Sequence, residues 1–141
     1  MRWFFDTSVL VQAFLADREH HERSLDAFLR AEKERDCCAA HSLAEFYAVV
    51  TRLPGKHRMN GDQVVLLLDN IRERLTTISL SVEEYRSVLS EAAKAQVFGG
   101  MIYDALIARC AQKASCEVLY TWNVKHFERF GSDIVKRVRT P

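Results

Sequence analysis

Apolar residues along the chain alternate between two spacings. Short, nearly continuous apolar or β-branched runs occur at residues 3–5, 37–40, 76–80 and 116–121, and such runs are typical of buried strands. Between them, apolar residues recur every three or four positions, as on one face of a helix. The helical pattern covers residues 9–15, 20–35, 43–53, 62–75, 81–96, 102–113 and 124–130, and residues 133–138 suggest a last strand or sheet edge. Strands that alternate with helices predict an α/β fold with a parallel sheet covered on both faces.

Local signals mark several ends of these elements. Ser81 and Glu84 have the spacing of a capping box, and Pro54-Gly55 ends the helix that precedes it. The expected helix caps are Thr7 or Ser8, Asp62 and Ser81. No repeat, low-complexity tract or linker interrupts the pattern, so we expect a single domain over residues 1–141.

Composition narrows the class of protein. A hydrophobic fraction of 48% and a charged fraction of 28% are those of a soluble globular chain rather than a disordered one. No apolar run is long enough to span a membrane, and Asp6 follows Arg2 too closely for a signal peptide, so we expect a cytoplasmic protein. The net charge of +1 gives no overall attraction to nucleic acid, which leaves only local basic patches. Adjacent Cys37 and Cys38 fall in a predicted strand and are interpreted as small apolar residues.

Three acids lack the basic neighbours that exposed helical acids usually have. Asp6 follows the first strand, where ligands bind in parallel sheets, although it could simply cap the next helix. Glu45 has no Lys or Arg at helical spacing, and only His41 could pair with it. Asp104 lies in the first turn of a helix, where the helix dipole also favours an acid. Taken together, the three acids favour one shared site.

A second polar segment, Thr121–Phe127, follows the strand at residues 116–121. If that strand is parallel to the first, its end lies near Asp6. Asn123 and His126 can each ligate a metal or position a water, although Asn123 could be a turn residue and His126 an ordinary surface histidine.

In order and spacing, these motifs resemble the VapC toxin branch of the PIN-domain ribonucleases. The resemblance covers essentially the whole chain, and it is carried by Phe5-Asp6-Thr7-Ser8-Val9-Leu10, Leu43-Ala44-Glu45-Phe46-Tyr47, Tyr103-Asp104-Ala105-Leu106-Ile107-Ala108 and Thr121-Trp122-Asn123 with His126-Phe127. It implies a three-layer α/β/α sandwich with a central, mainly parallel sheet. It also implies an endoribonuclease that uses Mg²⁺ or Mn²⁺, a cognate antitoxin and a homodimer.

The resemblance assigns roles to individual residues. Asp6, Glu45 and Asp104 would be the metal ligands and, with Asn123, the catalytic set. Thr7, Ser8, Thr121 and His126 would hold those ligands in place. Members of the family often have a fourth acid in the segment that corresponds to residues 121–127, where this chain offers Asn123 and His126. The predicted RNA-backbone contacts are Lys56, Arg58 and Lys125, for each of which ordinary surface charge is the alternative.

Two other functions compete with this one. The fold could have lost efficient chemistry and serve as a module that binds RNA or an antitoxin. A phosphoryl-transfer enzyme of the haloacid dehalogenase type would use Asp6 as nucleophile, but it requires a second acid two residues later, where this chain has Ser8. Val65, Leu66 and Leu67 could contact a partner, although we interpret them as core.

Overall fold

A central parallel sheet organises the molecule. The computed structural model describes residues 1–141. Its strands are β1 (Trp3–Phe5), β2 (Cys37–Ala39), β3 (Thr76–Ile78), β4 (Val118–Tyr120) and β5 (Val138–Arg139), in the order β3-β2-β1-β4-β5. Every neighbouring pair is parallel, so all five carboxyl ends lie on one edge of the sheet.

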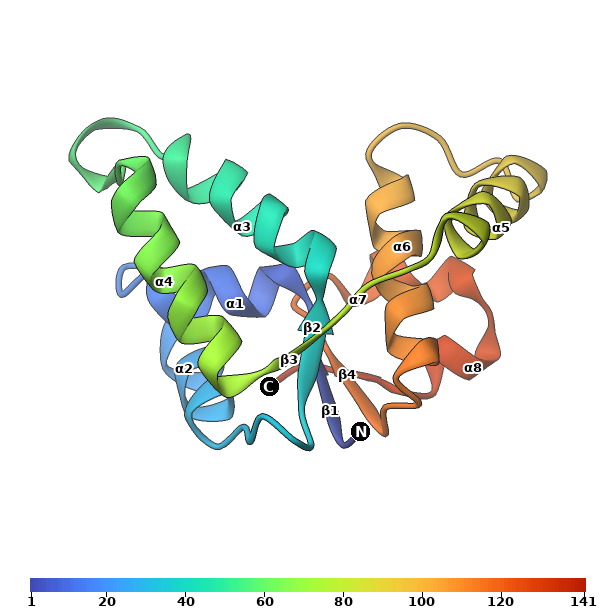
Figure 1. Cartoon of the computed structure of the whole chain (residues 1–141), viewed down its shortest axis with the longest axis horizontal. Coiled ribbons are helices and arrows are strands. Elements are labelled where there is room, and N and C mark those ends of the chain that lie inside the picture. Colours follow the sequence, from blue (N-terminus) through green and yellow to red (C-terminus); the bar gives the residue numbers. More distant parts are fainter.

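Helices cover both faces of this sheet (Figure 1). One layer consists of α1 (Thr7–Phe14), α2 (His21–Leu29), α3 (Ala40–Thr51) and α4 (Gly61–Arg74). The other consists of α5 (Val82–Lys94), α6 (Met101–Lys113), α7 (Val124–Phe127) and α8 (Ser132–Val135), with single 3₁₀ turns η1 (Gly55–His57) and η2 (Glu128–Phe130) completing the chain. The expected three-layer α/β/α sandwich is confirmed. None of these helices has the length and apolar character needed to cross a bilayer.

Alternating side chains of the strands supply two separate cores. Phe5 and Cys38 point into one core with residues of α1 to α4, whereas Phe4 and Cys37 point into the other with residues of α6, α7 and α8. This division follows from the twofold side-chain period of a strand, which lets adjacent large residues both be buried. The near-continuous apolar runs of the sequence reflect burial on both faces.

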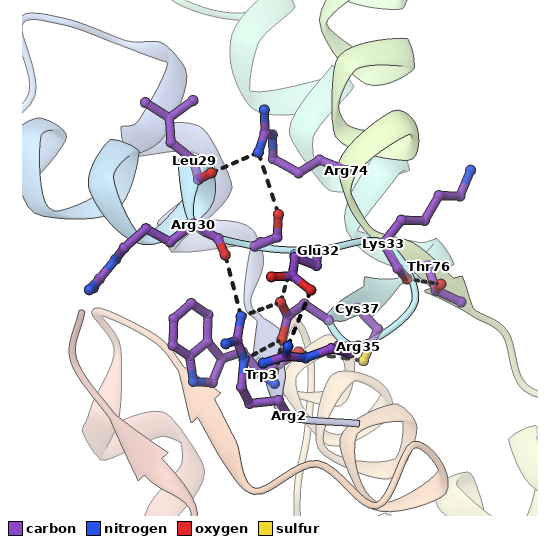
Figure 2. A network of polar contacts seen from close by, with 12 residues as sticks. Arg2, Trp3, Leu29, Arg30, Glu32, Lys33, Arg35, Cys37, Arg74 and Thr76 are labelled. Carbon is purple, nitrogen blue, oxygen red and sulfur yellow. Dashed lines mark hydrogen bonds and ion pairs between the residues drawn. The ribbon is translucent and has the colours of Figure 1, made fainter.

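An ion pair between half-buried Arg2 and buried Asp36 holds the amino edge of the sheet, opposite the carboxyl ends (Figure 2). The Arg2 guanidinium donates to both carboxylate oxygens of fully buried Asp36, at 2.7 and 3.2 Å. The backbone N–H groups of Trp3 and Glu32 donate to the same carboxylate, at 3.0 and 2.8 Å. Asp36 therefore joins the start of β1 to the connection that leads into β2.

Several element boundaries differ from those expected. Helix α4 is capped by Asn60, which shares a capping box with Gln63, and not by Asp62. The segment at residues 133–138 forms α8 and enters β5 only at Val138, and the helix expected at residues 20–35 ends at Leu29. The capping box of Ser81 and Glu84 is confirmed.

The interpretation of residues 65–67 as core is wrong for two of them. Val65 and Leu66 are 48% and 65% exposed, whereas Leu67 packs against the core. Residues 64–68 are all apolar, and five consecutive residues encircle a helix, so they cannot all face the sheet.

Candidate active site

Three acids from three elements line one cavity at the carboxyl edge of the sheet. Asp6 directly follows β1, Glu45 lies in the second turn of α3, which follows β2, and Asp104 lies in the first turn of α6. Figure 1 shows α3 with α4, and α5 with α6, extending beyond this edge on either side of it. The cavity has a volume of about 260 Å³ and is lined by Asp6, Thr7, Ser8, Val11, Gln12, Arg18, Glu45, Val49, Asp104 and Asn123.

Asp6 is held by hydroxyl groups from two elements. It is 2% exposed, and its Oδ2 accepts hydrogen bonds from Ser8 Oγ and Thr121 Oγ1, both at 2.7 Å. Those hydroxyls in turn accept from the backbone N–H groups of Trp122 and Asn123, at 3.0 and 2.9 Å. Asp6 occupies the N-cap position of α1 but makes no side-chain cap bond, and neither Thr7 nor Ser8 is the cap. The network thus fixes one carboxylate oxygen, and no side chain donates to the other.

Glu45 and Asp104 have weaker protein partners than Asp6. Thr7 Oγ1 donates to Glu45 Oε1 at 3.1 Å, and His41 Nε2 lies 3.5 Å from the same oxygen without a hydrogen bond. His126 Nδ1 lies 3.3 Å from Asp104 Oδ2. Neither acid has a Lys or Arg partner, so the charge of the cavity is not neutralised within the fold.

The protonation of these acids reflects that arrangement. Burial is the main cause that raises the pKa of Asp6, against the hydrogen bonds from Thr121 and Ser8, which lower it. Burial also raises the pKa of Glu45 to about 7, with a further contribution from the carboxylates of Asp6 and Asp104 and opposition from the Thr7 hydroxyl. The pKa of Asp104 is raised by burial and by Asp6, against the effect of His126. Raised carboxyl pKa values in a shared cavity are typical of functional sites.

The donor set suits a hard divalent cation. Carboxylate, hydroxyl and amide oxygens are the ligands of Mg²⁺ and Mn²⁺, and the cavity holds three carboxyl groups against one guanidinium, that of Arg18. The acids do not converge tightly enough to form a ready-made cluster of three ligands. Mg²⁺ does not require such a cluster, because it is usually bound by one or two carboxylates and keeps several waters.

The remaining predicted residues lie at different distances from the acids. Asn123 is exposed, lines the cavity and occupies the N-cap position of α7 without a side-chain cap bond. His126 meets the site only through Asp104. Lys125 is exposed on α7. Lys56 and Arg58 do not line the acid cavity but a second one.

Two polar residues of the cavity were not predicted, Gln12 and Arg18. Gln12 is four residues after Ser8 on α1, so helical spacing could have placed it on the same face. Its Oε1 accepts from the backbone N–H of His20 at 2.8 Å. Arg18 lies in the connection between α1 and α2, where no periodicity indicates direction.

Comparisons with known proteins point to one family. Residues 3–131 match the PIN domain family. Ribonuclease VapC40 of Mycobacterium tuberculosis (strain ATCC 25618 / H37Rv) is 35% identical over 114 residues, which make up 81% of each chain.

Solved structures share the fold. VapC20 of Mycobacterium tuberculosis, a sarcin-ricin loop cleaving toxin, matches with a TM-score of 0.70 at 12% identity, over 88% of this chain and 92% of that one. VapBC2 from Rickettsia felis, bound to a DNA fragment from its promoter, matches with a TM-score of 0.65 at 22% identity, over 99% and 98% of the two chains. At these identities the likeness establishes the fold alone.

Proposed function

This chain belongs to the PIN-domain family, in its VapC branch, and we propose that it is a divalent-metal-dependent endoribonuclease acting as the toxin of a toxin–antitoxin pair. The observation that carries the proposal is the placement of Asp6, Glu45 and Asp104, from three separate elements, in one cavity without a Lys or Arg ion-pair partner. Relatives named as ribonucleases support the reaction class.

Asp6, Glu45 and Asp104 would hold the cation. When bound, Mg²⁺ or Mn²⁺ would make a coordinated water more acidic and would act as a Lewis acid toward the phosphate oxygens. Ser8 and Thr121 fix Asp6 so that one oxygen is already committed and the other faces no competing side-chain donor. Thr7 orients Glu45, and His126 orients Asp104. Asn123, at the mouth of the same cavity, would bind a water or a ribose hydroxyl beside the reacting phosphate.

Without a bound cation, the three acids would not catalyse this reaction efficiently. Clustered carboxylates repel an anionic phosphodiester, and after burial, the main cause, repulsion by Asp6 and Asp104 also raises the pKa of Glu45. Cleavage without a cation would also lack a Lewis acid to polarise the phosphate. Activity is therefore expected to require both the three acids and an added metal.

The test is cleavage of single-stranded RNA by the purified, antitoxin-free chain. Reactions contain Mg²⁺, Mn²⁺ or EDTA, and the variants are Asp6→Asn and Asp104→Asn. The matched control is Asp62→Asn, because Asp62 is an exposed acid in the first turn of α4 and lines neither cavity. Metal-dependent cleavage that both site variants lose and the control retains supports the proposal. Absence of cleavage with either metal, from protein that melts cooperatively, would leave RNA or antitoxin binding without efficient chemistry as the better assignment.

The toxin role predicts a partner and a cellular effect. Val65 and Leu66 expose apolar surface on α4, and Val82 and Leu89 do so on α5, so a cognate antitoxin or a second copy of the chain has apolar faces to cover. Expression of the chain alone should arrest growth, and the Asp6→Asn variant should not. Equal arrest by both would contradict the assignment of Asp6.

A further inference from the structure

Arg18 differs from most other arginines of the chain in having no partner. Arg18 and Arg86 are the two whose side chains make no hydrogen bond, ion pair or aromatic contact, whereas the rest are engaged, as Arg109 is with Glu91 at 2.7 Å. Arg18 nevertheless lines the same cavity as Asp6, Glu45 and Asp104, and it is the only Lys or Arg there. An unpaired guanidinium beside three carboxylates is available to an external anion.

Arg18 also lines a second cavity. This second cavity, of about 670 Å³, is lined by Arg18, Lys56, His57 and Arg58, with Asp17 as its one acid. Three permanently charged cations thus face one carboxylate. The two cavities differ in sign, one acidic and one basic, and Arg18 lies on the wall of both.

The loop at Lys56, His57 and Arg58 makes two local contacts. Arg58 Nε donates to the Leu53 carbonyl at 3.1 Å, which anchors the head group while its other N–H groups remain unpaired. His57 Nδ1 lies 3.9 Å from Asp17 Oδ2, and this contact joins the loop to the connection that carries Arg18. Arg58 is thereby positioned in advance, which reduces the conformational entropy that it loses on binding an anion.

We propose that Arg18, with Lys56 and Arg58, forms a binding subsite for the RNA phosphate next to the one that is cleaved. The inference rests on the proposed function and adds the path of the substrate strand. The scissile phosphate lies over the acids, and the strand then leaves across Arg18 toward η1. A planar guanidinium binds a phosphate through two parallel N–H donors, so Arg18 sets the register of the strand relative to the acids.

The test compares two substrates and four proteins. One substrate is a single-stranded RNA oligonucleotide, and the other is a dinucleoside monophosphate, whose single phosphate is the scissile one. The proteins are the wild type, Arg18→Ala, Arg18→Lys and Arg86→Ala, where Arg86 is the matched control because it is equally unpaired and lines neither cavity. Metal and salt concentrations are varied in parallel.

On the oligonucleotide, Arg18→Ala should lower kcat/KM about tenfold, mainly through KM, because a charge-assisted contact made in the ground state is lost. The salt dependence of log(kcat/KM) should become shallower by about 0.7, the value for one single-strand phosphate contact. Arg18→Lys should restore part of the loss and the full salt slope. The dinucleotide should be cleaved equally by all four proteins.

The outcomes distinguish failure of the subsite from failure of the proposed function. Wild-type protein that cleaves the oligonucleotide while Arg18→Ala matches Arg86→Ala overturns the subsite and leaves the nuclease standing. A loss of equal size on both substrates also overturns it, because Arg18 would then act on the acids and not on the neighbouring phosphate. Wild-type protein that cleaves neither substrate overturns the proposed function and the subsite with it.

Discussion

Replacing Glu45 with glutamine should make the metal-free protein more stable while removing its activity. Burial and the carboxylates of Asp6 and Asp104 raise the Glu45 pKa from an ordinary value of 4.5 to about 7. Between these two values the native state binds more protons than the unfolded chain, so stability falls as pH rises. Above the upper value the ionised carboxylate is a constant cost. Glutamine has the same shape, can still accept the hydrogen bond from Thr7, and carries no charge.

The size of the gain follows from the two pKa values. A difference of about 2.5 corresponds to about 3 kcal/mol of unfolding free energy, at about 1.4 kcal/mol per pKa unit. This figure is an upper limit because the Glu45 side chain is 29% exposed and solvent screens part of the repulsion. His41, 3.5 Å away, does not offset the cost, since burial lowers its pKa and leaves it neutral when Glu45 is ionised.

The assay is urea unfolding of wild type and Glu45→Gln in EDTA at several pH values. At about pH 4.5 the two should have similar stability, and by about pH 8 the variant should be more stable by about 1–3 kcal/mol. Saturating Mg²⁺ should reverse the order, because the cation stabilises only the protein that keeps its ligand. A variant that is destabilised at high pH, or a stability difference that does not change with pH, would refute the reasoning that no neighbouring cation neutralises the Glu45 carboxylate.

Other consequences of the structure are directly measurable. Asp36→Ala should lower the unfolding free energy by about 3 kcal/mol, because it leaves Arg2 and two backbone N–H groups without their acceptor; a chemical denaturation midpoint near that of wild type would contradict this. Ser81→Ala should cost about 1 kcal/mol through loss of the capping box, with no change in RNA cleavage. His126→Asp should tighten Mg²⁺ binding about tenfold, measured by calorimetry, because it adds a carboxylate beside Asp104; weaker binding would place residue 126 outside the site.

The sequence predicted the layers of the fold well because both periodicities were strong. It failed where one pattern fits two structures. Residues 133–138 are too short for the spacing of Ile134, Val135 and Val138 to separate a helical turn from a strand. At α4 the capping-box spacing of Asn60 and Gln63 was present, but Asp62 was predicted as the cap because Asp is also a favoured N-cap residue.

The candidate site could be found in part because of what its acids lack. Asp6, Glu45 and Asp104 were singled out by the absence of Lys or Arg at helical spacing, and the structure places all three in one cavity. Arg18 could not be found in this way, since an arginine in a connection between helices has no periodicity that fixes its direction. The partner of an acid can be sought in the sequence, whereas the direction of a loop side chain depends on tertiary structure.

Strand polarity explains why two buried aspartates of this sheet have opposite roles. Asp36 precedes β2 and therefore lies at the amino edge, where Arg2 and two backbone N–H groups neutralise it. Asp6 follows β1 and lies at the carboxyl edge, where its side-chain partners are hydroxyls, no Lys or Arg pairs with it, and burial raises its pKa. Within the fold, Arg2 neutralises the charge of Asp36, whereas Asp6 has no cationic partner. A buried carboxylate that has no cationic partner is costly unless it is protonated or a ligand supplies positive charge, so the carboxyl edge is where the proposed cation would act.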